Sequence, residues 1–266
     1  LQAKWLGDCT PINPGPMFSF IVRNTKPVMT VSRIGVMQQV VNLLDGLNDR
    51  WEASGDLAGD LEKLFLYALA WSVGSLLETE DRFKFDEFLR SQDNKKNMPN
   101  VKEGQTIYEY MVDEKATWQL WRPPAWTYPE GDKLDFSNLL VPTMDSTRSL
   151  FLIKTLMKNK HAVCLVGSEG TAKTSNALMF CEMVKEDGSL VKRVNYSFAT
   201  TMFGAQSAVE VELDKRGGKN FGPPGNKKLI YFVDDLNMAA LDKYGTASNI
   251  SLMRQHMGYN HSYDMG

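Results

Sequence analysis

Apolar residues between positions 31 and 92 recur at the spacing of amphipathic helices. The first stretch carries Val36, Val40, Val41, Leu44 and Leu47, and the second carries Leu61, Leu64, Phe65, Ala68, Leu69 and Ser72. Turn-forming residues interrupt the pattern near Gly55 and after Leu77, and the polar-apolar segment DRFKFDEFLR follows the second break. The pattern therefore predicts three helices in this part of the chain.

The pattern changes between residues 94 and 142. The segments TIYEYMV and TWQLW alternate apolar and polar residues on either side of residues 113–116, and RPPAWTYPEGDK follows them. Alternation with a period of two is typical of short strands that flank a turn. We expect a connector that carries a β-hairpin.

Helical and strand-like segments alternate from Ser146 onward. Helices are predicted at residues 150–156, 174–185 and 208–215, and strands at residues 162–166, 192–197 and 229–233. A loop with the sequence GGKNFGPPGNKK, which we expect to be a solvated hairpin, precedes the last strand. The alternation favours an α/β fold with a mainly parallel sheet flanked by helices.

Composition and charge narrow the classes of function. The chain has 266 residues, 43% of them hydrophobic, and a formal net charge of -2. This charge gives no overall attraction to nucleic acid or to an anionic membrane, so we expect neither as a partner. The longest apolar run, residues 64–77, is shorter than the roughly 20 residues that cross a bilayer. Three widely separated cysteines predict a reducing compartment and no structural zinc.

The segment GSEGTAKT differs at one position from the phosphate-binding consensus G-x-x-x-x-G-K-[ST]. Its residues are Gly167, Ser168, Glu169, Gly170, Thr171, Ala172, Lys173 and Thr174, and Ala172 replaces a glycine. A glycine-rich turn between a strand and a helix directs backbone N–H groups at phosphate oxygens. Lys173 would reach the terminal phosphates and Thr174 would hold Mg²⁺. Ala172 is tolerated if its backbone is right-handed. The alternative is a plain strand-to-helix turn.

Two acidic residues follow the apolar strand LIYFV. Asp234 would lie beside the phosphate loop and orient a water bound to Mg²⁺, although an acidic strand end that faces solvent is the simpler alternative. Asp235 stands where ATPases of this plan usually have a glutamate that polarises the attacking water. Because its side chain is one methylene shorter, we expect nucleotide binding with slow hydrolysis.

Several stretches together resemble the AAA+ ring of dynein heavy chains, in particular its third module in axonemal dyneins. They are FLYALAWSVGSLLETEDRFKFDEFLR, KEGQTIYEYMVDE followed by Trp, LVPTMDSTRSLFL, VGSEGTAKT, SFATT, ELDKRGGKNFGPPGNKK and FVDDLNM. They occur in the family's order and cover most of the chain from about Leu57 onward. Ala239 is a departure, since the family usually has proline after the Asn-Met pair.

The resemblance implies a division of the chain into four parts. Residues 1–29 would form a junction, and residues 30–92 a helical lid-like subdomain of the preceding AAA+ module. Residues 93–137 would be the connector, and residues 138–266 a partial AAA+ P-loop large subdomain. Val141 and Pro142, in the motif LVPT, would contact adenine. The strand with the family's polar sensor residue, which lies between the phosphate-loop strand and the Asp-Asp strand, would come after Gly266.

The function implied by the resemblance is a regulatory module of a ciliary or flagellar motor that binds ATP or ADP with Mg²⁺. Its partners would be neighbouring AAA+ modules, other dynein chains and, through the whole motor, microtubules. It would lie in the cytoplasm, on the cytoskeleton of the axoneme. Two alternatives remain open: an independently competent P-loop ATPase in which Asp235 is the working base, and a structural ring segment with an empty pocket.

Overall fold

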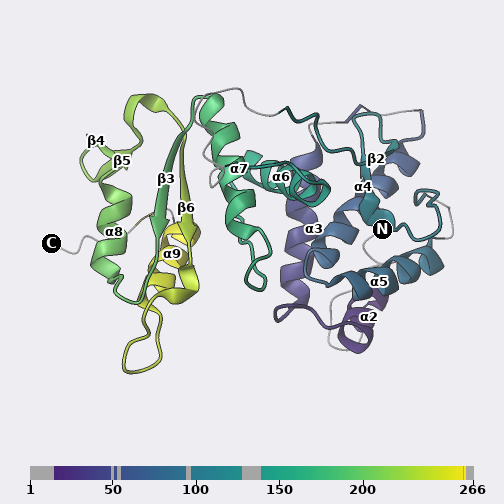
Figure 1. Ribbon diagram of the computed structural model, residues 1–266, viewed down its shortest axis with the longest axis horizontal. Helices are drawn as coiled ribbons and strands as arrows, with labels where there is room; N and C mark the ends of the chain where they lie inside the picture. Colours follow the sequence, from purple (N-terminus) through teal and green to yellow (C-terminus); the bar gives the residue numbers. More distant parts are fainter. Residues whose placement is uncertain are drawn as a thin grey trace. The chain divides into compact units, whose positions relative to one another are not determined.

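A computed structural model describes residues 15–48, 51–52, 55–93, 97–127, 139–259 and 261 of the chain. The chain forms two compact units, Leu1–Thr171 and Ala172–Gly266. The first unit is coloured purple to teal in Figure 1, and the second green to yellow. The boundary between the units falls inside the phosphate-loop motif.

The first unit is built mainly of helices. They are α2 (Pro16–Asn24), α3 (Arg33–Asn48), α4 (Leu57–Gly74), α5 (Thr79–Gln92) and α6 (Met144–Lys158). The three helices expected between residues 31 and 92 are confirmed as α3, α4 and α5. Helix α2, which the sequence pattern did not predict, buries Met17 and Ile21. Helix α6 begins with a capping box in which Thr143 and Ser146 exchange hydrogen bonds.

Helix α4 lies at the centre of the first unit. Leu66, Ala68, Leu69 and Ala70 on this helix are completely buried, and Tyr67 is 1% exposed. The Tyr67 ring lies near Trp118 and meets Phe151 of α6 edge-on, with ring centroids 6.4 and 6.3 Å apart. The long apolar run therefore belongs to a helix surrounded by protein. Among the helices of the described segments, none combines the length and apolar character needed to cross a membrane.

Two carboxylates of α5 attach this helix to neighbouring segments. Asp81 accepts hydrogen bonds from Lys84 Nζ and from the backbone N–H of Lys26, both at 2.7 Å. These bonds hold the pKa of Asp81 below its usual value. Asp86 pairs with Arg90 and accepts from the backbone N–H of Ile107 at 2.7 Å. Both aspartates thus fix the loops that follow α2 and precede the hairpin.

The expected hairpin in the connector is confirmed. Strands β1 (Tyr110–Val112) and β2 (Trp118–Leu120) pair antiparallel, with Tyr110 opposite Leu120, directly after the 3₁₀ turn η1 (Ile107–Glu109). The Asp113 carboxylate accepts from the backbone N–H groups of Lys115 and Thr117, which closes the turn between the strands.

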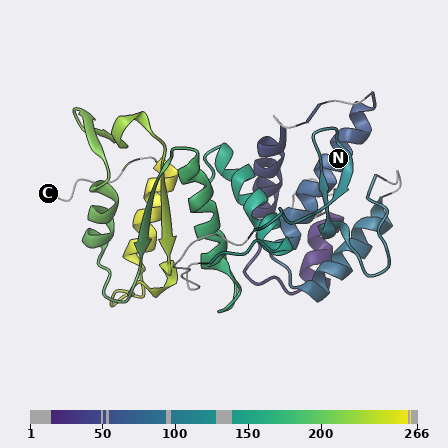
Figure 2. The same ribbon diagram turned by 45° about the horizontal axis from the view of Figure 1, so that its top comes forward.

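The second unit centres on two parallel strands. Strand β3 (Leu190–Asn195) pairs with β6 (Leu229–Asp234) over six residues, so that Leu190 lies opposite Leu229 and Asn195 opposite Asp234. Helices α7 (Lys173–Glu186) and α8 (Met202–Glu210) lie on opposite sides of these strands in Figures 1 and 2. The predicted strands at residues 192–197 and 229–233 are thus confirmed, as is the parallel pairing.

One face of the strand pair holds a small apolar core. Val194 and Val233 pack there with residues of α8 and of α9 (Ser248–Tyr259), including Ala205 and Leu252. The Tyr231 hydroxyl donates to the backbone oxygen of Val209 at 2.9 Å, and burial raises the pKa of Tyr231 to about 12. This bond joins β6 to the end of α8.

Two expectations for the second half of the chain are wrong in detail. Residues 162–166 form no strand, and Leu165 and Val166 are 36% and 52% exposed. A strand needs a hydrogen-bonded neighbour, and in the described residues the parallel sheet contains only β3 and β6. The helix expected at residues 208–215 lies earlier, in α8, because Thr201 caps it by accepting from the backbone N–H of Gly204.

The expected solvated hairpin is confirmed. After α8, the chain forms β4 (Asp214–Gly217) and β5 (Asn220–Gly222), which pair antiparallel. All four residues of β4 are exposed, as are Lys219, Lys227 and Lys228. Because most of these residues are charged, all are exposed and the strands are short, the hairpin is solvated.

Replacement of Gly46 in α3 tests the packing of α6. A Cβ at this position would overlap the backbone oxygen and side-chain methyl of Thr155, which is completely buried in α6. We expect Gly46→Ala to lower the free energy of unfolding of the first unit by about 2 kcal/mol. Urea unfolding followed by tryptophan fluorescence measures this unit, since every tryptophan precedes residue 127.

The matched control is Gly35→Ala in the same helix. A Cβ at Gly35 meets only the exposed Ser32 hydroxyl, which accepts from the Gly35 N–H at 3.0 Å and would lose that single bond if it rotated away. This variant should match the wild type to within about 1 kcal/mol, because alanine also has the higher helix propensity. Equal stabilities of the two variants would contradict the close approach of α3 and α6.

Candidate functional site

The phosphate-loop motif forms an exposed turn. The Thr171 hydroxyl donates to the backbone oxygen of Ser168 at 2.8 Å, and Gly170 has a φ of 73°. All residues from Gly167 to Ala172 are exposed, and helix α7 begins at Lys173. The motif therefore has the turn-then-helix form that presents backbone N–H groups to an anion.

The backbone of Ala172 does not meet the condition under which this residue would be tolerated, a right-handed conformation. Ala172 has φ 57° and ψ 24°, which is the left-handed region, and its backbone oxygen accepts from the N–H of Asn176 at 2.9 Å. This region costs a residue with a Cβ roughly 1–2 kcal/mol. This φ explains why the consensus has a glycine at this position.

Two of the predicted site residues come together in the second unit. Thr174 lies in the first turn of α7 and Asp234 ends β6, and the Thr174 hydroxyl donates to Asp234 Oδ1 at 3.3 Å. The side chain of Asp234 is 14% exposed. Lys173 occupies the first position of the same helix turn. The hydroxyl and the carboxylate thus meet at the N-terminal end of α7.

Asp235 turns away from the strand. Its φ of 54° and ψ of 38° are left-handed, a region that aspartate enters more readily than most residues. Its backbone oxygen accepts from the N–H of Met238 at 2.8 Å and closes the 3₁₀ turn η4 (Leu236–Met238). The residue is exposed, so its carboxylate is open to water.

Two residues of β3 complete the surroundings of Asp234 and were not predicted from the sequence. Arg193 donates through Nη2 to Asp234 Oδ2 and through Nε to Asn195 Oδ1, both at 2.8 Å. The guanidinium also lies 5.5 Å from the centre of the Phe232 ring. Alternation along the segment KRVNYS could have indicated them, because Arg193 and Asn195 share a face of the strand. The register with β6 was needed to pair them with Asp234.

The oxygen atoms at this position suit a magnesium ion. Hydroxyl and carboxylate oxygens are ligands that Mg²⁺ accepts, and it usually keeps waters and substrate phosphates as well. Among the described residues there is no group of three or more His, Cys, Asp or Glu that could hold a metal by itself. A metal at Thr174 and Asp234 would therefore depend on phosphate oxygens and water for its other ligands.

Val141 and Pro142 belong to the first unit and lie directly before Thr143, the N-cap of α6. Val141 is 45% exposed, so its side chain is available for contact. Their contact with adenine stays a prediction.

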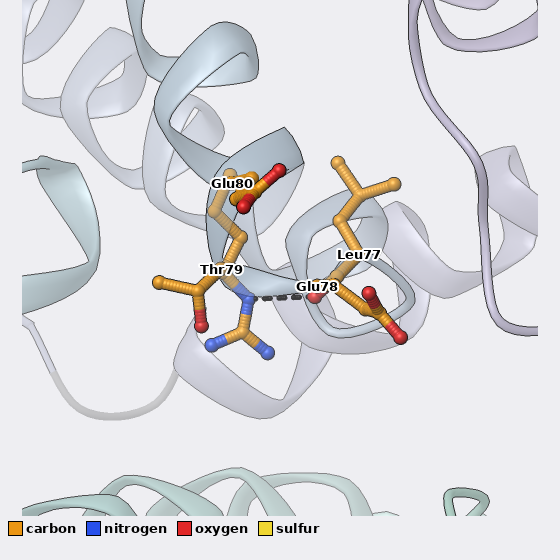
Figure 3. A pocket seen from close by; sticks show the side chains of 5 residues that line it. Leu77, Glu78, Thr79 and Glu80 are labelled. Carbon is orange, nitrogen blue, oxygen red and sulfur yellow. Dashed lines mark hydrogen bonds between the residues drawn. The ribbon is translucent and has the colours of Figure 1, made fainter.

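A surface hollow of about 360 Å³ lies at the turn between α4 and α5, lined by Leu77, Glu78, Thr79, Glu80 and Arg82. Figure 3 shows Leu77, Glu78, Thr79 and Glu80 around this hollow. Arg82 Nε donates to the backbone oxygens of Leu77 and Gly74, at 2.9 and 2.8 Å. The arginine thus satisfies the last carbonyl of α4 and one in the turn that follows it, a structural role at a helix end.

A glycine-rich turn that leads into a helix, beside the acidic end of a parallel strand, defines the class of P-loop nucleotide-binding proteins. Family models agree with this class. A model described as P-loop containing dynein motor region matches residues 128–266, and one described as dynein heavy chain AAA lid domain matches residues 14–123. The chain belongs to the dynein heavy chain family, with an AAA+ P-loop region and a helical lid.

Three curated relatives are dyneins of the axoneme or flagellum. The chain is 35% identical to dynein axonemal heavy chain 8 of Mus musculus over 253 residues, and 35% identical to dynein axonemal heavy chain 5 of Rattus norvegicus over 254 residues. It is 34% identical to the dynein gamma chain, flagellar outer arm, of Chlamydomonas reinhardtii over 256 residues. These alignments cover 93–94% of the chain and 5–7% of each relative. The resemblance to axonemal dynein heavy chains is confirmed.

Ala172→Gly tests the left-handed backbone. A glycine adopts this φ without the Cβ penalty, so the variant should be more stable than the wild type by about 1 kcal/mol. Hydrogen exchange of the α7 amides in increasing denaturant, followed by peptide mass spectrometry, measures the change separately from the helices of the first unit. Ala177→Gly, inside α7, is the control and should destabilise by about 1 kcal/mol. Destabilisation by both substitutions would contradict a left-handed Ala172.

Proposed function

We propose that the second unit is part of a regulatory nucleotide-binding AAA+ module, the third of the ring, in an axonemal dynein heavy chain. It binds ATP or ADP together with Mg²⁺. The approach of the Thr174 hydroxyl to Asp234 Oδ1, at 3.3 Å, carries this proposal. A plain strand-to-helix turn has no need to bring these two oxygens together at the start of a helix.

The proposal gives different roles to the backbone of the turn and to the side chains around it. The backbone N–H groups of residues 167–172 and the N-terminal end of α7 bind phosphate oxygens. Lys173 binds the terminal phosphates, and Thr174 and Asp234 hold Mg²⁺, whose charge neutralises the polyphosphate. Val141 and Pro142 contact the adenine ring.

The geometry of Asp235 favours slow hydrolysis of ATP. A carboxylate that acts as a general base must lie within hydrogen-bond reach of the attacking water. Asp235 has a short side chain, and its left-handed backbone leads directly into a 3₁₀ turn. The second candidate is a module that hydrolyses ATP independently, because the same carboxylate is exposed to water. The third candidate is a structural segment of the ring whose pocket is empty.

The proposed function also assigns roles to the other parts of the chain, its partners and its location. Residues 30–92 act as the lid of the preceding module, residues 1–29 as its junction, residues 93–137 as a connector, and residues 138–266 as the large subdomain. The module's partners are neighbouring AAA+ modules of the same heavy chain, other dynein chains and, through the whole motor, microtubules. The protein works in the cytoplasm, on the axoneme of a cilium or flagellum. The names of the relatives, an axonemal and a flagellar dynein chain, support this location.

Lys173→Ala tests nucleotide binding. In the intact motor region, ADP with Mg²⁺ should protect the amides around residues 167–176 from hydrogen exchange, and the variant should lose most of this protection. Removal of a charged contact to phosphate typically costs at least tenfold in affinity. Exchange measured by peptide mass spectrometry assigns the effect to this loop and excludes binding at other modules.

The matched control is Lys185→Ala, in the last turn of the same helix. Lys185 pairs with Glu182 at 2.7 Å and lies at the opposite end of α7 from the loop. This variant should keep the wild-type protection. Protection that is equal in wild type and Lys173→Ala would count against a nucleotide at the loop.

Asp235→Glu tests the slow turnover. The longer side chain restores the reach of the carboxylate, so single-turnover hydrolysis at this module should rise at least tenfold, within the range that general bases supply. The measurement uses the motor region with the main ATPase site disabled. Asp235→Asn is the control and should abolish the residual hydrolysis. Fast hydrolysis by the wild type would instead support the independently competent ATPase.

A further inference from the structure

Arg193 lies within reach of Asp234 because of the register of the two parallel strands. Arg193 is opposite Phe232 and Asn195 is opposite Asp234. Side chains two residues apart on one strand share a face, so these four residues line one face of the pair. The long Arg193 side chain extends diagonally across this face and reaches the carboxylate at the end of β6.

The two oxygens of Asp234 have different neighbours. Oδ1 accepts from the Thr174 hydroxyl at 3.3 Å, whereas Oδ2 accepts from Arg193 Nη2 at 2.8 Å. The oxygen directed at the phosphate loop therefore faces a neutral donor, and the other is paired with a permanent positive charge. The ion pair is only partly exposed, since the side chains of Arg193 and Asp234 are 43% and 14% exposed.

The guanidinium is held by further contacts. Its Nε donates to Asn195 Oδ1 at 2.8 Å, and its carbon lies 5.5 Å from the centre of the Phe232 ring. An arginine already held by one hydrogen bond and an aromatic neighbour loses little freedom when it binds a carboxylate. Arg193 is thus a fixed charge close to Asp234.

We propose that Arg193 is a positioning residue that weakens the binding of Mg²⁺ at Asp234. This role rests on the proposed function of the site. The guanidinium offsets the charge of the carboxylate and repels a divalent cation on its other side, while its hydrogen bond keeps Oδ1 directed at Thr174. Nucleotide retention at this module then depends on the concentration of free Mg²⁺.

The test is a Mg²⁺ titration of the intact motor region at saturating ADP. Hydrogen exchange of the peptides that cover residues 172–180 and 229–238 reports the Mg²⁺ concentration at half-maximal protection. Arg193→Gln removes the charge and keeps a side-chain donor, and Arg193→Lys keeps the charge. Lys192→Gln is the matched control, because it removes the same charge from the neighbouring residue of β3, which points to the opposite face and pairs with Glu212 at 2.6 Å.

We expect Arg193→Gln to lower the half-maximal Mg²⁺ concentration about tenfold, as the loss of one partly screened positive charge predicts. Lys192→Gln and Arg193→Lys should stay within about twofold of the wild type, since in both a positive charge remains beside Asp234. Without ligand, hydrogen exchange of the β3 and β6 amides should be the same in the wild type and in the three variants.

Two results would overturn the role of Arg193 and leave the proposed function standing. One is an unchanged or raised Mg²⁺ midpoint in Arg193→Gln, which is the behaviour of an arginine that only holds the strand end. The other is an Arg193→Lys midpoint equal to that of Arg193→Gln, which would show that charge is not responsible. Absence of ADP-dependent protection in the wild type at every Mg²⁺ concentration would overturn the proposed function and this role together.

Discussion

The parallel pairing of β3 with β6 is the constraint on which the candidate site depends. Six residue pairs set the register, and this register places Asn195 opposite Asp234 and Arg193 opposite Phe232. Parallel strands bring their carboxyl ends to one edge, where ligands of α/β proteins bind. Helix α7 brings Thr174 to the same edge. A shift of one residue in the pairing would move Asp234 to the other face of the strands and remove the site.

Left-handed backbone conformations at two residues with side chains form the second constraint. Ala172 and Asp235 both have positive φ. Ala172 lies two positions before Thr174 and Asp235 directly follows Asp234, the two residues proposed to hold the metal. Such conformations cost free energy and persist when the surrounding structure fixes them. Here the start of α7 fixes Ala172, and the turn η4 fixes Asp235. Both ends of the candidate site therefore depend on a backbone conformation that glycine adopts at lower cost.

The spacing of apolar and polar residues along the chain predicted correctly those helices and strands whose formation depends on nearby residues. Helices α3, α4 and α5, the hairpin β1–β2 and the pairing of two parallel strands are confirmed. Residues 162–166 could not be predicted correctly from their apolar character, because a strand depends on a neighbour that another segment supplies. The φ of Ala172 is likewise set by the turn as a whole. Arg193 was missed because its partner is 41 residues away, and only the strand register brings the two together.

The most direct test of the central claim is a density map of the intact motor ring at the N-terminal end of α7. The account predicts a nucleotide whose phosphates contact Lys173, with a Mg²⁺ ion between the Thr174 hydroxyl and the Asp234 carboxylate. An empty loop, or a Lys173 side chain directed away from Asp234 in a ring that was supplied with Mg²⁺ and nucleotide, would contradict it.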